Sequence, residues 1–250
     1  MGIEIYTNLA YIVAAALFIF GLKMLGSPAT ARRGNAFSSM AMLIAVVAGL
    51  IGSQAVSYEV IIVGMLIGAL IGTLSARLVA MTSMPELVAL FNGSGGASSL
   101  LVGWATLYYF EGDSVPTFTA ATIVLAILIG GLTFTGSLIA YGKLSERINS
   151  AALVFSGQRV LNSALLLAIV ACAYLFCMDP SATSVYLYAL LGLALLLGVM
   201  AVIPIGGADM PVVISLLNSY SGIAACAAGF AVGNNTLVVA GAVVGASGII

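Results

Sequence analysis

Charged residues are scarce in this sequence, and histidine is absent from it. Of 250 residues only 6% are charged, whereas soluble proteins average about 25%. The seven basic residues are scattered along the chain, so no basic patch is available for nucleic acid, and nucleic-acid binding is excluded. With 62% hydrophobic residues, the composition is that of an integral membrane protein.

Cysteine is also scarce. Cys172, Cys177 and Cys226 lie in apolar runs, without CxxC spacing and without a histidine beside them. They therefore fit neither a disulfide framework nor a zinc site, and we expect small buried side chains and no metal. The first apolar run follows no basic residue and precedes no small-residue cleavage site, so it is predicted to be a membrane span and not a signal peptide.

Charges and turn residues divide the chain into nine continuously apolar runs. A transmembrane helix needs about 20 predominantly apolar residues, and most of the runs have roughly this length. The sequence therefore predicts an all-α fold, a polytopic membrane bundle of nine transmembrane helices. The predicted spans are residues 3–23, 37–54, 59–80, 85–109, 117–140, 157–178, 183–204, 210–232 and 235 onward.

Lysine and arginine fall on only one side of this predicted topology. The connections 53–59, 111–116 and 178–184 contain acids and no base. Because cytoplasmic loops are enriched in lysine and arginine, we predict that the N-terminus is outside and the C-terminus is cytoplasmic. The basic residues of the other side are Lys23, Arg32, Arg33, Arg77, Lys143, Arg147 and Arg159.

The last apolar run, TLVVAGAVVGASGII, has about 15 residues and is short for a membrane span. We therefore expect the polypeptide to continue on the cytoplasmic side, with residues 1–250 forming one transmembrane domain.

Glycines at four-residue spacing predict close contacts between helices. Such stripes let two helix backbones approach where no hydrophobic force drives association. They occur at Gly64, Gly68 and Gly72, and again at Gly241 and Gly245.

Two stripes of polar and small residues recur at helical spacing inside predicted spans. Polar groups at bilayer depth are costly, so they are candidates for function. We expect the stripes to face each other and to line a hydrated proton path, with Asn92 and Asn218 at similar depth. The first stripe is Asn92, Gly96, Ser99 and Gly103, and the second is Pro211, Ser215, Asn218 and Gly222.

Each of these two spans begins with an acid next to a proline. Glu86 follows Pro85, and Asp209 precedes Pro211, a residue type that suits the start of a helix. The two carboxylates are candidates for the cytoplasmic mouth of the path. In the alternative reading, the asparagines only hydrogen-bond neighbouring helices, and the acids only complement the helix dipoles.

The stretches MPELVALFNGSGG (84–96) and GGADMPVVISLLNSYSGIAACAAGF (206–230) resemble the membrane domain of the β subunit of the proton-translocating nicotinamide nucleotide transhydrogenases. In span count and orientation, the resemblance extends over essentially the whole chain. It implies that protons move inward through this domain and drive hydride transfer from NADH to NADP+. It also implies that NADP(H) and NAD(H) bind associated soluble domains, with the NADP(H)-binding domain after residue 250.

The resemblance further implies the surroundings of this chain. Its expected partners are α-side subunits with membrane helices of their own and a second protomer, which makes a homodimer. The expected location is the bacterial inner membrane, which the chain crosses several times in contact with lipid. No catalytic or cofactor-binding residue is expected in the chain itself.

Several residues carry roles by this resemblance. The family's channel asparagine in LNSYSG falls on Asn218, and its acid in GGADMP falls on Asp209. Gly206 and Gly207 permit backbone conformations that other residues avoid, so we expect their loop to transmit the state of the NADP(H)-binding domain. Many members place a proton-carrying histidine where this chain has Asn92. We therefore expect a histidine of an α-side helix to point toward the two asparagines.

Two other classes of function fit part of the pattern. A secondary transporter also has polar residues near the midplane, but it usually shows inverted repeats, and none is convincing here. A passive scaffold would explain the glycines but not two polar stripes at matched depth.

Overall fold

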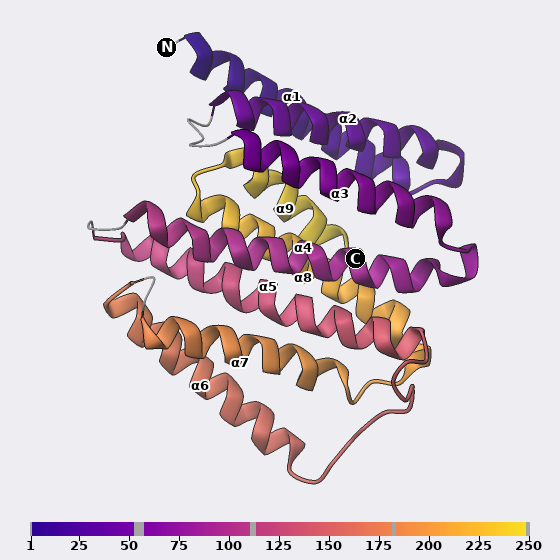
Figure 1. The fold of residues 1–250 in the computed structure, drawn as a ribbon, viewed down its shortest axis with the longest axis vertical. Helices are drawn as coiled ribbons and strands as arrows, with labels where there is room; N and C mark the ends of the chain where they lie inside the picture. Colours follow the sequence, from indigo (N-terminus) through magenta and orange to yellow (C-terminus); the bar gives the residue numbers. More distant parts are fainter. Residues whose placement is uncertain (1, 53–57, 111–113, 182–183, 249–250) are drawn as a thin grey trace. The chain divides into compact units, whose positions relative to one another are not determined.

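The fold is that of a computed structural model that describes residues 2–52, 58–110, 114–181 and 184–248. Regular structure in these ranges is helical throughout, which confirms the predicted all-α fold (Figure 1). Eight of the helices are long and apolar enough to cross a membrane, and α9 has 13 residues. The helices are α1 (Gly2–Leu25), α2 (Pro28–Gly52), α3 (Tyr58–Leu78), α4 (Met84–Thr106), α5 (Thr117–Leu144), α6 (Gln158–Met178), α7 (Val185–Val202), α8 (Met210–Ala231) and α9 (Asn235–Ser247).

The predicted start of the second helix, α2, was wrong. The other helices begin within about two residues of the predicted position, as expected where a bound is set by a charge or a proline. Helix α2 begins at Pro28 instead of residue 37 and includes Arg32 and Arg33. Proline suits the first turn of a helix, and a membrane helix can extend past the apolar core into the polar boundary. Apolarity marked only the membrane-embedded part of this helix.

The described chain divides into two compact units, residues 1–80 and 81–250. In the first unit, α1 and α2 form an antiparallel hairpin. A Cβ atom on Gly34 would lie 2.7 Å from the carbonyl oxygen of Gly21, and one on Gly21 would lie 3.0 Å from that of Gly34. The two backbones therefore touch at this point, and only glycine fits on either side.

Helix α3 of the first unit has no buried residue among those described. Its glycine stripe, Gly64, Gly68 and Gly72, has no atom of another described element within 4 Å of the positions where Cβ atoms would lie. The predicted close packing of this stripe is therefore not found within the described part of the chain.

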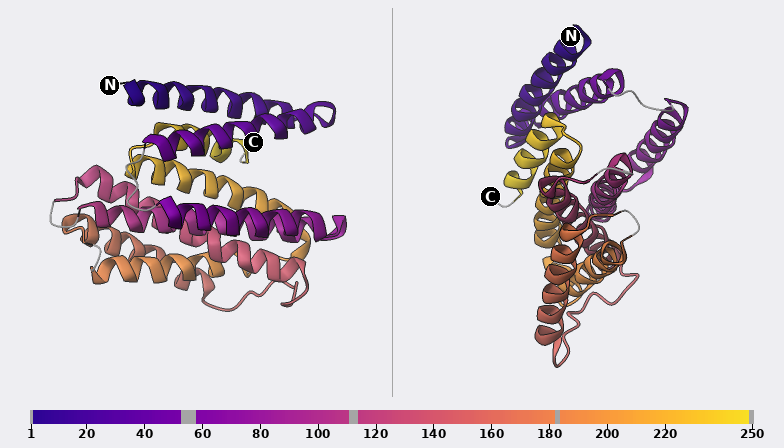
Figure 2. Two further views of the ribbon diagram at one scale, coloured as in Figure 1. Left: turned by 45° about the horizontal axis from the view of Figure 1, so that its top comes forward. Right: turned by 90° about the vertical axis from the view of Figure 1, so that its left-hand side faces the viewer.

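The second unit is built around α5. This helix packs against α4, α7 and α8, and it is apolar on every side, as a central helix must be. Neighbouring helices alternate in direction, so the starts of α4, α6 and α8 lie at the end where α5 and α7 finish (Figure 2). The core residues Ile123, Ile127 and Leu190 are at most 1% exposed.

Helices α8 and α9 form a close glycine contact in this unit. A Cβ atom on Gly222 would lie 2.8 Å from the carbonyl oxygen of Gly241, and one on Gly241 would lie 2.7 Å from that of Gly222. Gly245 packs against the Ile223 side chain beside it. The packing predicted for Gly241 and Gly245 is thus confirmed.

The three cysteines lie in helices of this unit. Cys172, Cys177 and Cys226 are all free thiols, and each is half-buried instead of fully buried as expected. Among the described residues, no group of three or more histidine, cysteine, aspartate or glutamate side chains could hold a metal ion.

Candidate functional site

The polar stripe of α4 lies on one buried face, as predicted, and this face packs against α5. Asn92, Gly96, Ser99 and Gly103 are all buried. At the centre of the contact, a Cβ atom on Gly96 would lie 2.8 Å from the carbonyl oxygen of Gly130, and one on Gly130 would lie 2.6 Å from that of Gly96. Because these glycines have no side chain, the two backbones touch here, and the stripe does not form an open groove at this contact.

Asn92 is held between two other helices by its side-chain amide. The amide nitrogen Nδ2 donates to Ser137 Oγ of α5 at 2.9 Å. The hydroxyl of Ser221 on α8 donates to the amide oxygen Oδ1 at 2.8 Å and also reaches the Asn92 carbonyl oxygen at 3.3 Å. Asn92 is 8% exposed. A largely buried, continuous hydrogen-bonded chain therefore runs from α5 through α4 to α8. We call Asn92, Ser137 and Ser221 the polar cluster.

A second buried hydroxyl lies one turn from the polar cluster. Thr133 of α5 is fully buried, and its Oγ1 has no hydrogen-bond partner among the described residues. It precedes Ser137 by one helical turn and packs against Gly96. A buried hydroxyl without a partner is costly and is more often satisfied by an ordered water than left empty. Ser99, by contrast, donates to the Gly95 carbonyl oxygen of its own helix at 3.2 Å.

The expectation that the α8 stripe faces the α4 stripe was wrong. Gly222 packs on α9, and Ser215 donates to the Gly248 carbonyl oxygen at 3.2 Å, so these two residues face the α9 side. Asn218 is exposed and makes no hydrogen bond to another described residue, and Pro211 is also exposed. The residue of α8 that reaches Asn92 is Ser221.

The sequence analysis missed both serines of the polar cluster. Ser221 lies three residues after Asn218, which places it about 60° round the helix, enough to turn it from one neighbouring helix to another. Ser137 follows Thr133 by four residues, so two hydroxyls recur on one face of α5. This repeat was the feature of the sequence that could have identified Ser137 as a site residue on α5.

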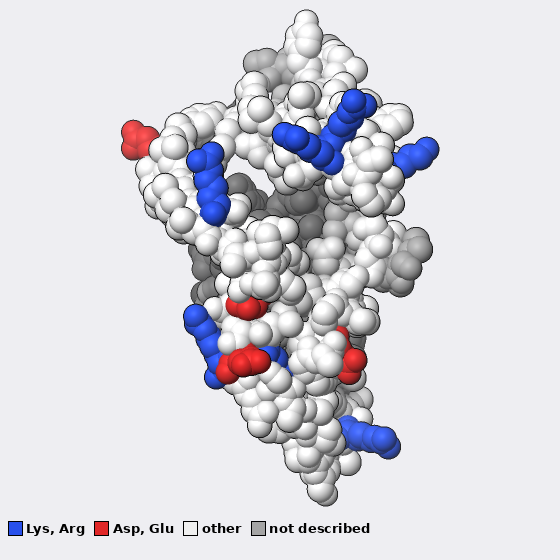
Figure 3. Space-filling model, turned by 90° about the vertical axis from the view of Figure 1, so that its right-hand side faces the viewer, with Lys and Arg blue, Asp and Glu red and all other residues white. Residues whose placement is uncertain are grey.

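The predicted cytoplasmic mouth lies at the end of the unit where α4 and α8 begin. Acidic and basic side chains are both present at this end (Figure 3). Glu86 in the first turn of α4 is half-buried, and Asp209, directly before α8, is exposed. Neither carboxylate is hydrogen-bonded or paired within the described chain, so both are open to water or to a partner.

The two glycines beside Asp209 were predicted for the wrong reason. Gly206 has φ −71° and ψ 155°, an extended conformation that any residue adopts, and Gly207 is not among the described residues with positive φ. Space is tight at Gly207, because a Cβ atom there would lie 3.0 Å from the Cβ atom of Ser150. Its amide donates to the Ser150 carbonyl oxygen at 2.8 Å.

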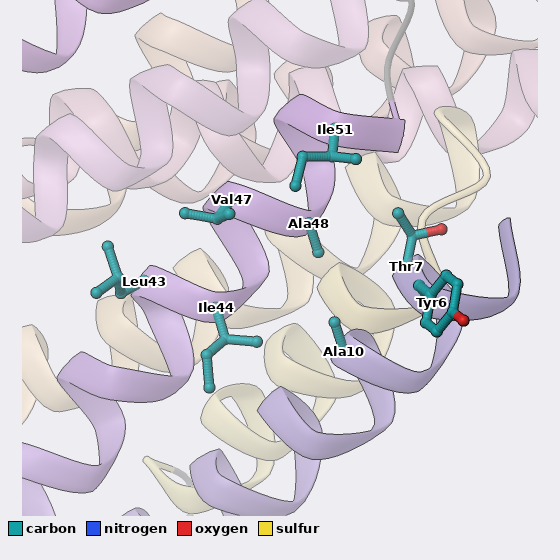
Figure 4. Close-up of a pocket in the computed structure, with 8 residues that line it drawn as sticks. All are labelled: Tyr6, Thr7, Ala10, Leu43, Ile44, Val47, Ala48 and Ile51. Atoms are coloured by element: carbon teal, nitrogen blue, oxygen red, sulfur yellow. The ribbon is translucent and has the colours of Figure 1, made fainter. Parts of the chain in front are cut away.

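The first unit contains a hollow of about 520 Å³ between α1 and α2. Figure 4 shows that its lining is almost entirely alkyl, with oxygens only on Tyr6 and Thr7. Leu43 and Ile51 at this hollow are 62% and 60% exposed, as lipid-facing side chains would be. The hollow therefore offers no carboxylate, amine or imidazole for proton chemistry, and the polar cluster is the stronger candidate site.

The fold and the site together define a multi-pass α-helical membrane protein with a buried polar cluster that joins three of its helices. Residues 7–250 match the sequence profile of the NAD(P) transhydrogenase beta subunit family. The chain belongs to this family, and the resemblance noted in its sequence is thereby confirmed.

Two relatives show the extent of the match. The NAD(P) transhydrogenase subunit beta of Rhodospirillum rubrum, and that of one strain of the same species, are each 42% identical to this chain over 250 residues. The alignment covers 98% of this chain and 53% of each relative. The chain therefore spans about half the length of the curated relatives that it matches.

Proposed function

We propose that residues 1–250 form the proton-translocating membrane domain of an NAD(P) transhydrogenase. In the reaction, NADH loses a hydride and becomes NAD+, and NADP+ accepts the hydride and becomes NADPH. The protons that cross the membrane take no part in this chemical balance; they supply the driving force. NAD(H) and NADP(H) bind to soluble domains associated with this chain, the latter in a domain that follows residue 250.

Further proposals concern the setting of the chain. Its partners are an α-side subunit with membrane helices and a second protomer, in the inner membrane of a bacterium. The N-terminus lies outside and the C-terminus in the cytoplasm. The connections that contain lysine and arginine are on the same side as the C-terminus, and such connections are usually cytoplasmic.

The observation that carries the proposal is the polar cluster. Asn92 supplies one amide donor and one amide acceptor, and the serine hydroxyls on either side can each donate and accept. The amide itself does not relay a proton, but these donors and acceptors can orient water molecules, along which a proton passes if a titrating group stands at the end. Membrane helices hold buried polar groups of this kind at positions where they serve transport.

The titrating group has to come from outside the chain, because amides and hydroxyls do not titrate near neutral pH and the chain has no histidine. Asn218 is exposed on α8, three residues before Ser221, so it can meet a helix of the α-side subunit. We propose that a histidine of this helix contacts Asn218 and exchanges protons with water that the polar cluster orients. Ser99 and Ser215 stay weaker candidates, since both hydroxyls are held by backbone carbonyls.

The proposed function is tested with the full-length protein and its partner subunits in sealed liposomes. Addition of NADPH and NAD+ outside the vesicles should move protons across the membrane as hydride is transferred, and an imposed proton gradient should speed or slow the reaction according to its direction. Hydride transfer without any proton movement would refute the proposed proton-translocating role. Flux of a solute without nucleotides would support a transporter instead.

Substitution of Asp209 by asparagine is expected to lower coupled turnover. Asp209 is exposed at the start of α8, so its carboxylate can contact a soluble domain or deliver protons, and the amide keeps its shape but loses its charge. The measurement is proton movement per hydride transferred in the liposomes described above. Glu4, at the start of α1, is the control, because Glu4→Gln also removes one exposed carboxylate. Unchanged proton pumping in Asp209→Asn would reject the proposed role.

Substitution of Asn218 by leucine is expected to block proton movement while the protein still assembles. The side chain is exposed within this chain, so leucine leaves the bundle intact and removes only the amide offered to the partner helix. The measurement is proton uptake together with size-exclusion chromatography of the assembled protein. Leu216→Asn, an exchange at an exposed position two residues away, tests whether any change on this part of α8 has the same effect. A fully active Asn218→Leu enzyme would contradict the role.

A further inference from the structure

Lys143, in the last turn of α5, is only 2% exposed although it is a cation. Its Nζ donates to three backbone carbonyl oxygens: Ala151 at 3.0 Å, Ile203 at 2.7 Å and Ile205 at 2.6 Å. Three acceptors match the three protons of an ammonium group, whereas a neutral amine has only two. The buried charge is thus fully hydrogen-bonded, which is the condition under which a protein tolerates it.

The three carbonyl oxygens belong to two different connections between helices. Ala151 lies in the connection from α5 to α6, residues 145–157, and the other two acceptors lie in the connection from α7 to α8, residues 203–209. Ile203 is the C-cap of α7, and its carbonyl group, which has no partner within the helix, carries the partial negative charge of a helix end. A single ammonium group therefore bridges both connections and caps α7.

Direct backbone bonds reinforce the bridge. The Gly207 amide donates to the Ser150 carbonyl oxygen at 2.8 Å, and the Leu153 amide donates to the Ile203 carbonyl oxygen at 3.3 Å. The Ser150 hydroxyl donates to the carbonyl oxygen of Lys143 itself at 2.8 Å. The two connections thus form one hydrogen-bonded unit around the buried ammonium group.

Two of the four helices joined by these connections, α5 and α8, carry the serines that bond Asn92. Helix α5 ends one residue after Lys143 and carries Ser137, which lies about 9 Å along the helix axis from it. Helix α8 begins directly after the bridged connection and carries Ser221. The axial positions of α5 and α8 relative to one another decide whether both serines reach the Asn92 amide.

We infer that Lys143 is a positioning residue of the polar cluster. Its ammonium group fixes the end of α5 against the start of α8 and so sets the spacing of Ser137 and Ser221 across Asn92. A second part of the inference rests on the proposed function. In the enzyme, a soluble domain that contacts Asp209 acts on the proton path through Lys143.

The test replaces Lys143 with methionine, which is unbranched and one atom shorter and removes the charge and all three donors. Hydrogen exchange is measured on the full-length protein with its partner subunits. In Lys143→Met, amides of residues 203–209 and 150–153 are expected to exchange about tenfold faster or more, since their bonds lose the shared charged centre. Protons moved per hydride transferred are expected to fall, a ratio that lower protein yield alone would not change.

Two further variants make the result specific. Lys23→Met is the matched control, because Lys23 is the other lysine of the chain, is exposed, and also lies in the last turn of a helix. Ser150→Val leaves Lys143 in place but pushes a larger side chain against Gly207 and removes the hydroxyl bond. In Ser150→Val the amides of residues 203–209 are also expected to exchange faster. This variant provides the test if Lys143→Met does not fold.

The outcomes separate this inference from the proposed function. Unchanged exchange at residues 203–209 in Lys143→Met, or in Ser150→Val if Lys143→Met does not fold, would overturn the inference. Faster exchange with an unchanged proton-to-hydride ratio would overturn the link to proton passage. If the unaltered enzyme moves no protons, the proposed function fails, and hydrogen exchange alone still decides whether Lys143 positions the two connections.

Discussion

Replacing Gly96 by valine is expected to separate α4 from α5 and to lower the stability of the protein, whereas the same change at Gly95 is expected to be nearly neutral. A Cβ atom at Gly96 would lie 2.8 Å from the Gly130 carbonyl oxygen and 2.9 Å from the Phe134 amide nitrogen. Both contacts are with backbone, which cannot rotate away, so the helices have to move apart. Gly95, one residue earlier, has no atom of another element within 4 Å.

The expected cost at Gly96 is about 1–3 kcal/mol or more, the usual range for overpacking a well-packed contact. Helix propensity cannot produce the difference, because both substitutions exchange glycine for valine in the interior of the same helix. The free energy of unfolding is obtained from denaturant titration in detergent, with thermal unfolding of the assembled protein as a second measure. Equal stability of Gly96→Val and Gly95→Val would show that the two backbones do not touch.

Loss of stability at Gly96 should be accompanied by loss of function. Gly96 lies one turn after Asn92, so a displaced α4 carries the amide away from Ser137. Gly95→Val is expected to retain proton movement.

Replacing Asn92 by leucine is expected to reduce coupled turnover strongly with a smaller effect on assembly. Leucine has the branched shape of asparagine but is larger and neither accepts nor donates, so Ser137 loses its partner and Ser221 keeps only the Asn92 carbonyl oxygen. Leaving a buried hydroxyl unpaired costs about 1–3 kcal/mol, although in membrane proteins a single hydrogen bond is often worth nearer 0.6 kcal/mol.

A rate can be estimated from the same interactions. If the polar cluster lowers the barrier to proton passage by about 1–2 kcal/mol, its loss slows coupled turnover about five- to thirtyfold. The measurement is proton movement and hydride transfer in sealed liposomes. Ser94→Ala is the control on the same helix, because Ser94 is exposed and its hydroxyl donates only to the Phe91 carbonyl oxygen. Wild-type proton pumping by Asn92→Leu would remove the polar cluster from the path.

The polar stripes show how far sequence reasoning reached into the site. On α4, Asn92, Gly96 and Ser99 were placed correctly on one buried face, because residues three and four apart lie together on any helix. On α8 the same rule grouped Asn218 with Gly222, but Gly222 packs against α9 and Asn218 is exposed. Helical periodicity says which residues share a face, and it does not say which neighbour covers that face.

The sequence by itself determined the class of the protein and the bounds of most helices. Continuous apolar runs have to be helical inside a bilayer, since only helices satisfy every backbone group within one segment, and charges and prolines mark their ends. The sequence did not decide the environment of Lys143. Its position at a helix end predicts a cation that is solvated on the cytoplasmic side. Only the tertiary structure decided that this ammonium is buried on three carbonyls, and that Asn92 bonds Ser137 and Ser221. These partners lie 45 or more residues apart or in separate connections, and their contact depends on how helices pack, which no local pattern encodes.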